Sequence, residues 1–535
     1  MMMEVQTKER MSILKVIVVI LLLLMIYKVS KSIFNNFRNL IVPCPIGMLP
    51  NKCNPFLYSV IYILSIFRQS RKSGLPLPLL IFQSVLGMCC EVVAKERIFF
   101  LYLFQKPGVI LYKPETVQVV LSSSTIIEKS VHYSFIHSWL GRGLFTSPGS
   151  KWRHRKKLLA PTFHSSILEN FIPVFQEQSS ILVSKLRALT KEPWVDISPL
   201  ANLCTLDIIC QTAMGVRINA QTNENKEYVK ALHEVTEAIT NRPFRPWLYP
   251  DIIYYMTTEG KRYKSYLQCM HGLTRKVIKE KKAEMLEHNT SKEEKETTGD
   301  TLFPVQKRKA FLEYLLEYHF KDPSLTEEDI KEEVDTFLFA GHDTTGMGIS
   351  WILYCIGLYP EVQKKVVDEL DQIFQNEPER EVTREDLTKM KYLECAIKET
   401  FRLYPPASFL MRECEEKIEI LGHTIFPGSF CAVFTYALHR DPESFPDPER
   451  FIPERFFPEN CIGRHPYAYV PFSSGPRNCI GQKFGMMEMK VLAANVLRSF
   501  QVTSLDPRDK VLVVPNLTLK NAKPLRLRFE IRRKR

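Results

Sequence analysis

The pattern of apolar and polar positions predicts a chain that is mostly helical from about residue 110 onward. Residues 280–309 are highly charged and have no apolar period, which predicts a solvated loop between helices. Strand-like runs are few and lie at 108–113, 416–426, 430–438 and 524–531. We therefore expect a mainly α fold with a small β portion, in one large domain that spans residues 108–535.

One predicted helix is much longer than the others. The segment 325–360 begins with a capping pattern at Thr326 and Asp329, and it ends before a proline. About 33 helical residues would be about 50 Å long at 1.5 Å per residue, so this helix should cross the middle of the domain. Its centre, AGHDTTGMG, predicts either a tolerated kink between packed helices or a groove where Asp343 and Thr344 relay protons.

The N-terminal region has a different character. Residues 11–27 form an apolar run with more positive charge after it than before it, and no small-residue cleavage site follows. This favours an uncleaved signal anchor over residues 1–30 rather than a signal peptide, with the rest of the chain in the cytosol. Residues 31–107 are predicted to be a membrane-associated linker. In it, 55–67 lies in the membrane interface or packs in the protein, and 73–80 forms a proline hinge. If 55–67 crossed the membrane, the orientation would reverse.

Composition narrows the class of protein. Hydrophobic residues make up 45% and charged residues 24% of the chain, as expected for a globular protein with a large core. The net charge of +13 suits an acidic partner or an anionic membrane, and no helix-turn-helix or zinc spacing suggests nucleic acid. The 13 cysteines contain no C-x-x-C pair, which favours buried thiols in a reducing compartment over a disulfide framework.

The stretch PFSSGPRNCIGQKFG concentrates residues that suit a cysteine thiolate bound to the iron of a flat macrocycle. Gly475 and Gly481 would let the backbone approach the macrocycle closely. Arg477 can neutralise a propionate, and Phe472 can shield the sulfur from water. The N–H groups of the helix that follows would stabilise the thiolate of Cys479.

Other roles for Cys479 are weaker. A hydrolytic cysteine needs a partner histidine that is itself oriented by a third group. His439 and His465 are present, but neither has neighbours typical of such a base. The metal-ligand interpretation of Cys479 is therefore preferred.

An ion pair is predicted near the end of the helix 392–406, of a kind that by itself is common on protein surfaces. Glu399 and Arg402 are three residues apart and share one helical face. The proline-rich segment DPERF at 447–451 has little periodicity and needs an anchor. We expect Arg450 to reach the pair and hold it in place.

Taken together, the motifs AGHDTT, ETFR, PERF and FSSGPRNCIG resemble, in this order, those of the cytochrome P450 family of membrane-anchored haem-thiolate monooxygenases. WLGRGLFTSPGSKWRHRKKLLAPTFH and EVDTFLFAGHDTT are similar to the fourth family, whose typical members hydroxylate fatty acids near the ω end. The resemblance implies the cytochrome P450 fold with the long helix over the haem. It also implies site residues: Cys479 as the proximal iron ligand, Asp343 and Thr344 as proton donors in dioxygen activation, and Glu399, Arg402 and Arg450 as a structural triad.

The resemblance implies haem b as cofactor, with two departures from the family pattern. Ala340 stands where many fourth-family members have a glutamate that esterifies the haem, so non-covalent attachment is expected. Trp152 and Lys156 match a propionate-binding Trp-x-x-x-Arg motif, in which lysine keeps the charge but not the fork geometry. Arg412 matches another propionate-binding arginine.

Partners and location also follow from the resemblance. Electrons are expected from NADPH through NADPH-cytochrome P450 reductase, with cytochrome b5 as a second donor. The basic residues 151–157 and Lys483 would form the reductase surface, although a plain solvated helix face explains them equally well. The resemblance places the protein in the endoplasmic reticulum membrane, with a single N-terminal anchor and a cytosolic catalytic domain.

The substrate is expected to be lipophilic, a fatty acid or a related lipid. Its contacts are predicted at 131–146, 335–344, 405–411 and 520–524, with Phe337, Phe409, Leu410 and Met411 either lining the pocket or packing in the core. Two alternatives stay open: a haem-thiolate isomerase or dehydratase of peroxides, and a non-catalytic haem-binding or gas-sensing membrane protein. The intact Asp343–Thr344 pair and the complete set of motifs favour the monooxygenase.

Overall fold

The structure is a computed structural model. It describes residues 66, 68–87, 89, 97–103, 106–222, 225–296, 311–375, 377 and 380–532. The chain divides into two compact units, Met1–Leu57 and Tyr58–Arg535, and every described residue belongs to the second. The predicted anchor at 1–30 and nearly all of 55–67 lie outside the described residues. Within the described part of the chain, no helix has the length and apolar character that a membrane span requires.

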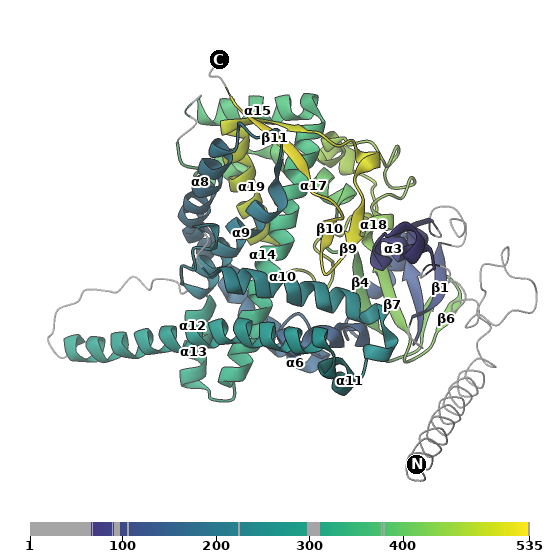
Figure 1. Cartoon of the computed structure of the whole chain (residues 1–535), viewed down its shortest axis with the longest axis horizontal. Helices are drawn as coiled ribbons and strands as arrows, with labels where there is room; N and C mark the ends of the chain where they lie inside the picture. The colour runs from purple at the N-terminus through teal and green to yellow at the C-terminus, as the bar shows by residue number, and fades with distance from the viewer. Residues whose placement is uncertain are drawn as a thin grey trace, which may run out of the picture. The chain divides into compact units, whose positions relative to one another are not determined.

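Helices account for most of the unit Tyr58–Arg535 (Figure 1). The α-helices are α3 (Leu77–Gly87), α4 (Pro114–Leu121), α5 (His137–Leu140), α6 (Gly149–Leu159), α7 (Ser165–Leu168), α8 (Ile172–Ala188), α9 (Ile197–Ile209), α10 (Lys226–Asn241), α11 (Asp251–Met256), α12 (Thr258–Glu296), α13 (Phe311–Lys321), α14 (Glu327–Leu358), α15 (Pro360–Phe374), α16 (Arg384–Lys389), α17 (Lys391–Leu403), α18 (Thr435–Leu438) and α19 (Gln482–Ser499). The prediction of a mainly α fold is confirmed.

The predicted long helix is α14, a continuous helix of 32 residues. Its start is fixed by a capping box, in which the Thr326 hydroxyl accepts from the Asp329 N–H at 3.1 Å and the Asp329 carboxylate accepts from the Thr326 N–H at 3.1 Å. Two of its central glycines face α9 at close range, because a Cβ at Gly341 or Gly346 would overlap Ile209 or Asn202. The glycines therefore serve close helix packing, and α14 passes through the middle of the helical part beside α9 and α19 (Figure 1).

The predicted solvated loop at 280–309 is wrong for its first half. Helix α12 continues to Glu296, and residues 297–310 are outside the described part. Lysine and glutamate are good helix formers, so a charged segment without an apolar period can still be helical. Lys281 also pairs with Glu284 one turn later at 3.1 Å and with Glu313 of α13 at 2.7 Å.

The strands among the residues that the structure describes form four small sheets. The largest has the order β1-β2-β7-β4, with β1 (Ile98–Leu103) antiparallel to β2 (Lys106–Leu111), β2 parallel to β7 (Phe430–Phe434), and β7 antiparallel to β4 (Phe409–Glu413). The others are β3-β11-β8 (Val195–Asp196, Arg526–Ile531, Phe500–Ser504), the hairpin β9–β10 (Val513–Pro515, Leu519–Asn521) and the hairpin β5–β6 (Ile418–Ile420, His423–Ile425). Three predicted strand regions are confirmed as β2, β5–β6 and β11. The fourth, 430–438, is strand only as far as Phe434 and continues as α18.

The folded domain extends further toward the N-terminus than predicted. Residue 108 lies inside β2, and β1 before it is paired with β2. Helix α3 also packs on the body, where the Phe82 ring lies 5.4 Å from Phe434 and 4.9 Å from Tyr436. The predicted proline hinge at 73–80 overlaps the start of α3, because proline is tolerated in the first turn of a helix.

Candidate active site around Cys479

The cysteine loop is closed by backbone hydrogen bonds just before α19. The Cys479 N–H donates to the Phe472 carbonyl at 2.9 Å, and the Asn478 N–H donates to the Gly475 carbonyl at 3.1 Å. The Phe472 ring packs edge-on against Phe401 of α17 at 5.8 Å. These contacts fix the position of Cys479 relative to α17 and α19.

Gly475 is required by the backbone of this loop. Its φ is +67°, in the left-handed region that favours glycine. A Cβ at this position would also overlap the carbonyl oxygen of Leu121, at the end of α4. The loop therefore approaches α4 as closely as it does only because residue 475 has no side chain.

Replacing Gly475 by alanine is expected to lower the free energy of unfolding by about 2–3 kcal/mol, since it adds a steric overlap to a left-handed backbone. Gly428→Ala is the matched control, because Gly428 has φ +81° and no atom within 4 Å of the added Cβ. That control should lose only about 1 kcal/mol. Thermal unfolding of both variants measures the difference, and equal losses would show that the contact with Leu121 is unimportant.

Cys479 is reachable by a ligand. It has the accessible surface of an exposed residue. Its thiol is nevertheless surrounded closely enough that burial raises its pKa, while the Gly481 N–H and the Lys156 ammonium oppose that rise. Both opposing groups stabilise a sulfur anion, so a positive ion bound at the sulfur would complete the thiolate site.

Three cations lie close together on one side of this loop: Lys129, Arg412 and Arg477. The Arg477 guanidinium lies 4.3 Å from the centre of the buried Trp152 ring. Its other partners are neutral carbonyl groups, at Ile127 (3.0 Å), Leu144 (3.4 Å) and Ser147 (2.7 Å). The Arg412 side chain is 2% exposed and donates to the Met411 carbonyl at 3.0 Å.

Lys129 is a member of this group that no sequence motif indicated. Its backbone pairs with that of Arg412. Its ammonium lies 4.6 Å from the ring centre of Tyr133 and 4.5 Å from that of Phe145. The signal in the sequence is a lysine two positions after the apolar pair Ile126–Ile127, and that signal is too common to be useful.

The three cations together suit the binding of an anionic ligand. Burial lowers the pKa of all three, to about 9 for Arg477, and repulsion from Arg412 lowers the pKa of Lys129 and Arg477 further. Within the described part of the chain, none of them forms an ion pair. Arg412 is buried, and Lys129 and Arg477 are half-buried. Charges withdrawn from water are ordinarily paired, so this group calls for negative charge from outside the chain. A cofactor with two carboxylates beside a metal that takes a thiolate fits this arrangement, and haem has both features.

The sequence predicts that Lys156 binds a propionate, and in this structure its side chain contacts the cysteine loop. Its ammonium donates to the Pro476 carbonyl and, at 2.7 Å, to the Asn478 side-chain oxygen. It therefore holds the cysteine loop. Trp152, its partner in the predicted motif, lies beneath Arg477 as described above.

Asp343 and Thr344 lie on α14, and the side chains of both form hydrogen bonds within the protein. Asp343 is 4% exposed, and its two oxygens contact Lys520 at 3.0 Å and Thr518 at 2.6 Å. The Thr344 hydroxyl donates to the Ala340 carbonyl at 2.5 Å, one turn earlier. Burial opposes ionisation of Asp343, but Lys520, His342 and Thr518 outweigh it and lower its pKa below the usual value. Asp343 is therefore an ionised, paired carboxylate in this conformation.

The predicted contact between Glu399 and Arg402 is present, and both side chains are fully buried. Arg402 binds Glu399 through two nitrogens at 2.7 and 2.8 Å. It also donates to the carbonyl groups of His439 (3.1 Å), Pro448 (2.7 Å) and Arg450 (2.9 Å). The pair thus holds the irregular segment after α18 in place, as expected.

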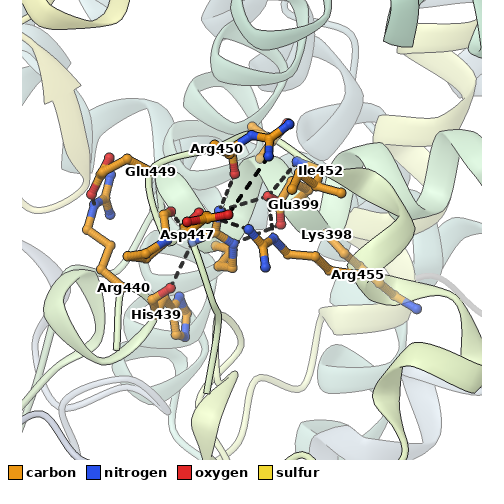
Figure 2. A network of polar contacts seen from close by, with 12 residues as sticks. Lys398, Glu399, His439, Arg440, Asp447, Glu449, Arg450, Ile452 and Arg455 are labelled. Atoms are coloured by element: carbon orange, nitrogen blue, oxygen red, sulfur yellow. Dashed lines mark hydrogen bonds and ion pairs between the residues drawn. The ribbon is translucent and has the colours of Figure 1, made fainter. Parts of the chain in front are cut away.

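The third member of this group differs from the prediction. The Arg450 side chain is 72% exposed and its nearest acid is Asp447 at 3.8 Å, so only its backbone carbonyl contributes. Arg455 takes the place instead, with its Nε 3.5 Å from the Glu399 carboxylate and 10% of its side chain exposed (Figure 2). The sequence PERF occurs twice in succession, and the structure selects the second copy.

The apolar residues predicted either to line the substrate pocket or to pack in the core differ in burial. Phe337 is buried and lies against Phe311, with the ring centres 4.3 Å apart. Phe409, Leu410 and Met411 of β4 are half-buried. Phe409 stacks on Phe434 at 4.4 Å, and Leu410 packs against a separate apolar cluster that includes residues of β2 and β7. Core packing therefore describes Phe337, whereas the other three side chains are only partly covered.

Comparison with known proteins agrees with these features. The family model for cytochrome P450 matches residues 80–529. The chain is 48% identical over 424 residues to cytochrome P450 4V2 of Mus musculus, covering 78% of this chain and 79% of the mouse protein. It is 44% identical over 427 residues to cytochrome P450 4c3 of Drosophila melanogaster, covering 79% and 80%. The chain therefore belongs to the cytochrome P450 family of haem-dependent monooxygenases, with relatives in its fourth family.

Proposed function

We propose that this protein inserts one oxygen atom of dioxygen into a C–H bond of a lipophilic substrate, a fatty acid or related lipid, near its ω end. The observation that supports this most strongly is the Cys479 thiol beside three cations, Lys129, Arg412 and Arg477, that form no ion pair among the residues that the structure describes. A bound haem b supplies dioxygen activation, favoured by electron donation from a thiolate. The substrate class rests on the resemblance to the fourth family.

The protein's part in this reaction is to hold and orient. Cys479 would be the iron ligand, and Lys129, Arg412 and Arg477 would bind the two propionates. Ala340 offers no carboxylate for an ester bond, so the attachment would be non-covalent. Lys156 fixes the cysteine loop, and Phe472 and Gly481 shape it. Asp343 and Thr344 would supply protons from α14.

Electrons are proposed to arrive from NADPH-cytochrome P450 reductase, with cytochrome b5 as a second donor. Of the basic segment 151–157, Lys151 pairs with Glu332 at 2.7 Å and Arg155 pairs with Asp329 at 2.5 Å. The exposed positive side chains beside the cysteine loop are Arg153, Lys157 and Lys483. An acidic flavoprotein surface would be attracted to these three rather than to the whole segment.

Membrane association is supported by an exposed apolar surface on the loop and helix around α11. Its members are Trp247 (61% exposed), Ile252 (79%), Ile253 (47%) and Met256 (73%). Large apolar side chains this close together and this exposed are typical of an interaction surface, and tryptophan is favoured at the membrane–water boundary. We propose that this surface touches the lipid of the endoplasmic reticulum membrane, to which a single N-terminal anchor would also attach the chain, with the catalytic domain in the cytosol.

Turnover with a purified reductase tests this function. The full chain in lipid vesicles should convert a fatty acid into a hydroxylated product that carries one atom of labelled dioxygen, and it should need both NADPH and reductase. A panel of fatty acids, steroids and terpenoids identifies the preferred class. Rearrangement of a lipid peroxide without NADPH would instead indicate the isomerase or dehydratase, and haem binding without any product would indicate a non-catalytic protein.

A further inference from the structure

The carboxylate of Asp343 is locked by the C-terminal hairpin β9–β10. Lys520 Nζ lies 3.0 Å from one carboxylate oxygen, and the Thr518 hydroxyl donates to the other at 2.6 Å. The Thr344 hydroxyl donates to a carbonyl of its own helix. In this arrangement neither member of the proposed proton relay is free to pass a proton to another group.

The hairpin is itself held firmly at the residue between these two. The Leu519 N–H donates to the Pro406 carbonyl at 2.8 Å, and the indole N–H of Trp351 donates to the Leu519 carbonyl at 3.0 Å. Side chains alternate along an extended chain, so Thr518 and Lys520 project to the same side. Two anchors on Leu519 therefore present both groups to Asp343 together.

Lys520 also connects the buried acid with water. Its side chain is 23% exposed, whereas that of Asp343 is 6% exposed. The neighbouring His342 is buried, and its Nδ1 faces the Leu338 carbonyl at 2.6 Å. Among the described residues around this carboxylate, Lys520 is therefore the charged group that is both paired with Asp343 and partly open to solvent.

We propose that Lys520 is a positioning residue that gates the proton relay, keeping Asp343 turned to the hairpin until the Lys520 side chain moves away. The predicted substrate contacts include 520–524, so we infer that bound substrate displaces Lys520 and releases Asp343. Once freed from Lys520, the ionised carboxylate can take up a proton from water and pass it on, so protons would be delivered only when substrate is present. This inference rests on the proposed function, in which Asp343 supplies protons.

The lock is tested without turnover by a double-mutant cycle on thermal unfolding. The variants are Asp343→Asn, Lys520→Met and the double substitution, with Lys510→Met as the control because Lys510 is 72% exposed. The losses in melting temperature should be non-additive, since each single variant already breaks the same pair. Strictly additive losses would overturn the lock.

The gate is tested by NADPH oxidation in the absence of substrate, with purified reductase. Lys520→Met should raise this rate about 3- to 10-fold and lower the share of electrons found in product, because the acid can then act at the wrong time. Lys520→Arg should restore the native rate, and Lys510→Met should match the native protein. A Lys520→Met variant that behaves like Lys510→Met would overturn the gate.

The Asp343→Asn background separates this inference from the proposed function. Asp343→Asn should lower product formation about 100-fold, the usual scale of a general acid, and should cancel the effect of Lys520→Met. If Asp343→Asn keeps native product formation, the proposed relay fails. If Asp343→Asn is impaired but Lys520→Met still raises NADPH oxidation in that background, the gate alone fails.

Discussion

Replacing Glu399 by glutamine is expected to lower the free energy of unfolding by about 3–5 kcal/mol, because Arg402 would be left buried without a countercharge. Both side chains are fully buried, and Arg402 reaches the segment after α18 through three carbonyl groups. The loss therefore includes the anchoring of that segment. Chemical denaturation followed by far-UV circular dichroism measures it.

Two arginine variants serve as controls for this prediction. Arg455→Gln should destabilise the protein by about 1–3 kcal/mol, since it removes a buried partner of Glu399. Arg450→Gln should change stability by no more than about 0.5 kcal/mol, because that side chain is exposed. A larger loss for Arg450→Gln than for Arg455→Gln would contradict the arrangement in Figure 2.

Replacing Arg412 by methionine is expected to change stability in opposite directions in the two states of the protein. Without haem, Arg412 is a buried cation with only neutral partners, so methionine should raise the free energy of unfolding by about 1–3 kcal/mol. With haem bound, the same change would leave a propionate unpaired and should lower it by about 3–5 kcal/mol.

Thermal unfolding of Arg412→Met before and after haem loading measures the change in stability in each state. Lys510→Met is a suitable control, because an exposed lysine should give no change in either state. A variant that is destabilised equally with and without haem would show that Arg412 has a purely structural role. In that case the propionates would have to be bound by other residues.

The parts of the site that could be predicted are those that depend on contacts between residues close together in the sequence. The cysteine loop depends on close backbone approach, and Gly475 is readable because only glycine tolerates its φ and its contact with Leu121. The start of α14 was readable from Thr326 and Asp329, whose capping box involves only neighbouring residues. The Glu399–Arg402 pair is likewise a contact within one helical turn.

The parts that were missed depend on contacts between distant segments. Arg450 and Arg455 sit in identical PERF sequences, and only the path of the chain decides which one reaches Glu399. Lys129 joins the cation group because its strand-like segment pairs with Arg412. The partner of Asp343 lies in the C-terminal hairpin, where nothing in the local pattern points to a buried acid.

The carbon monoxide difference spectrum of the reduced protein tests the central claim most directly, because it reports the ligand of the iron. The account predicts the red-shifted band of a thiolate-bound haem for the native protein, and loss of that band together with turnover for Cys479→Ser. Gly428→Ala, which changes an open turn, should keep both. A native protein without the shifted band, or a Cys479→Ser variant that retains it, would contradict the account.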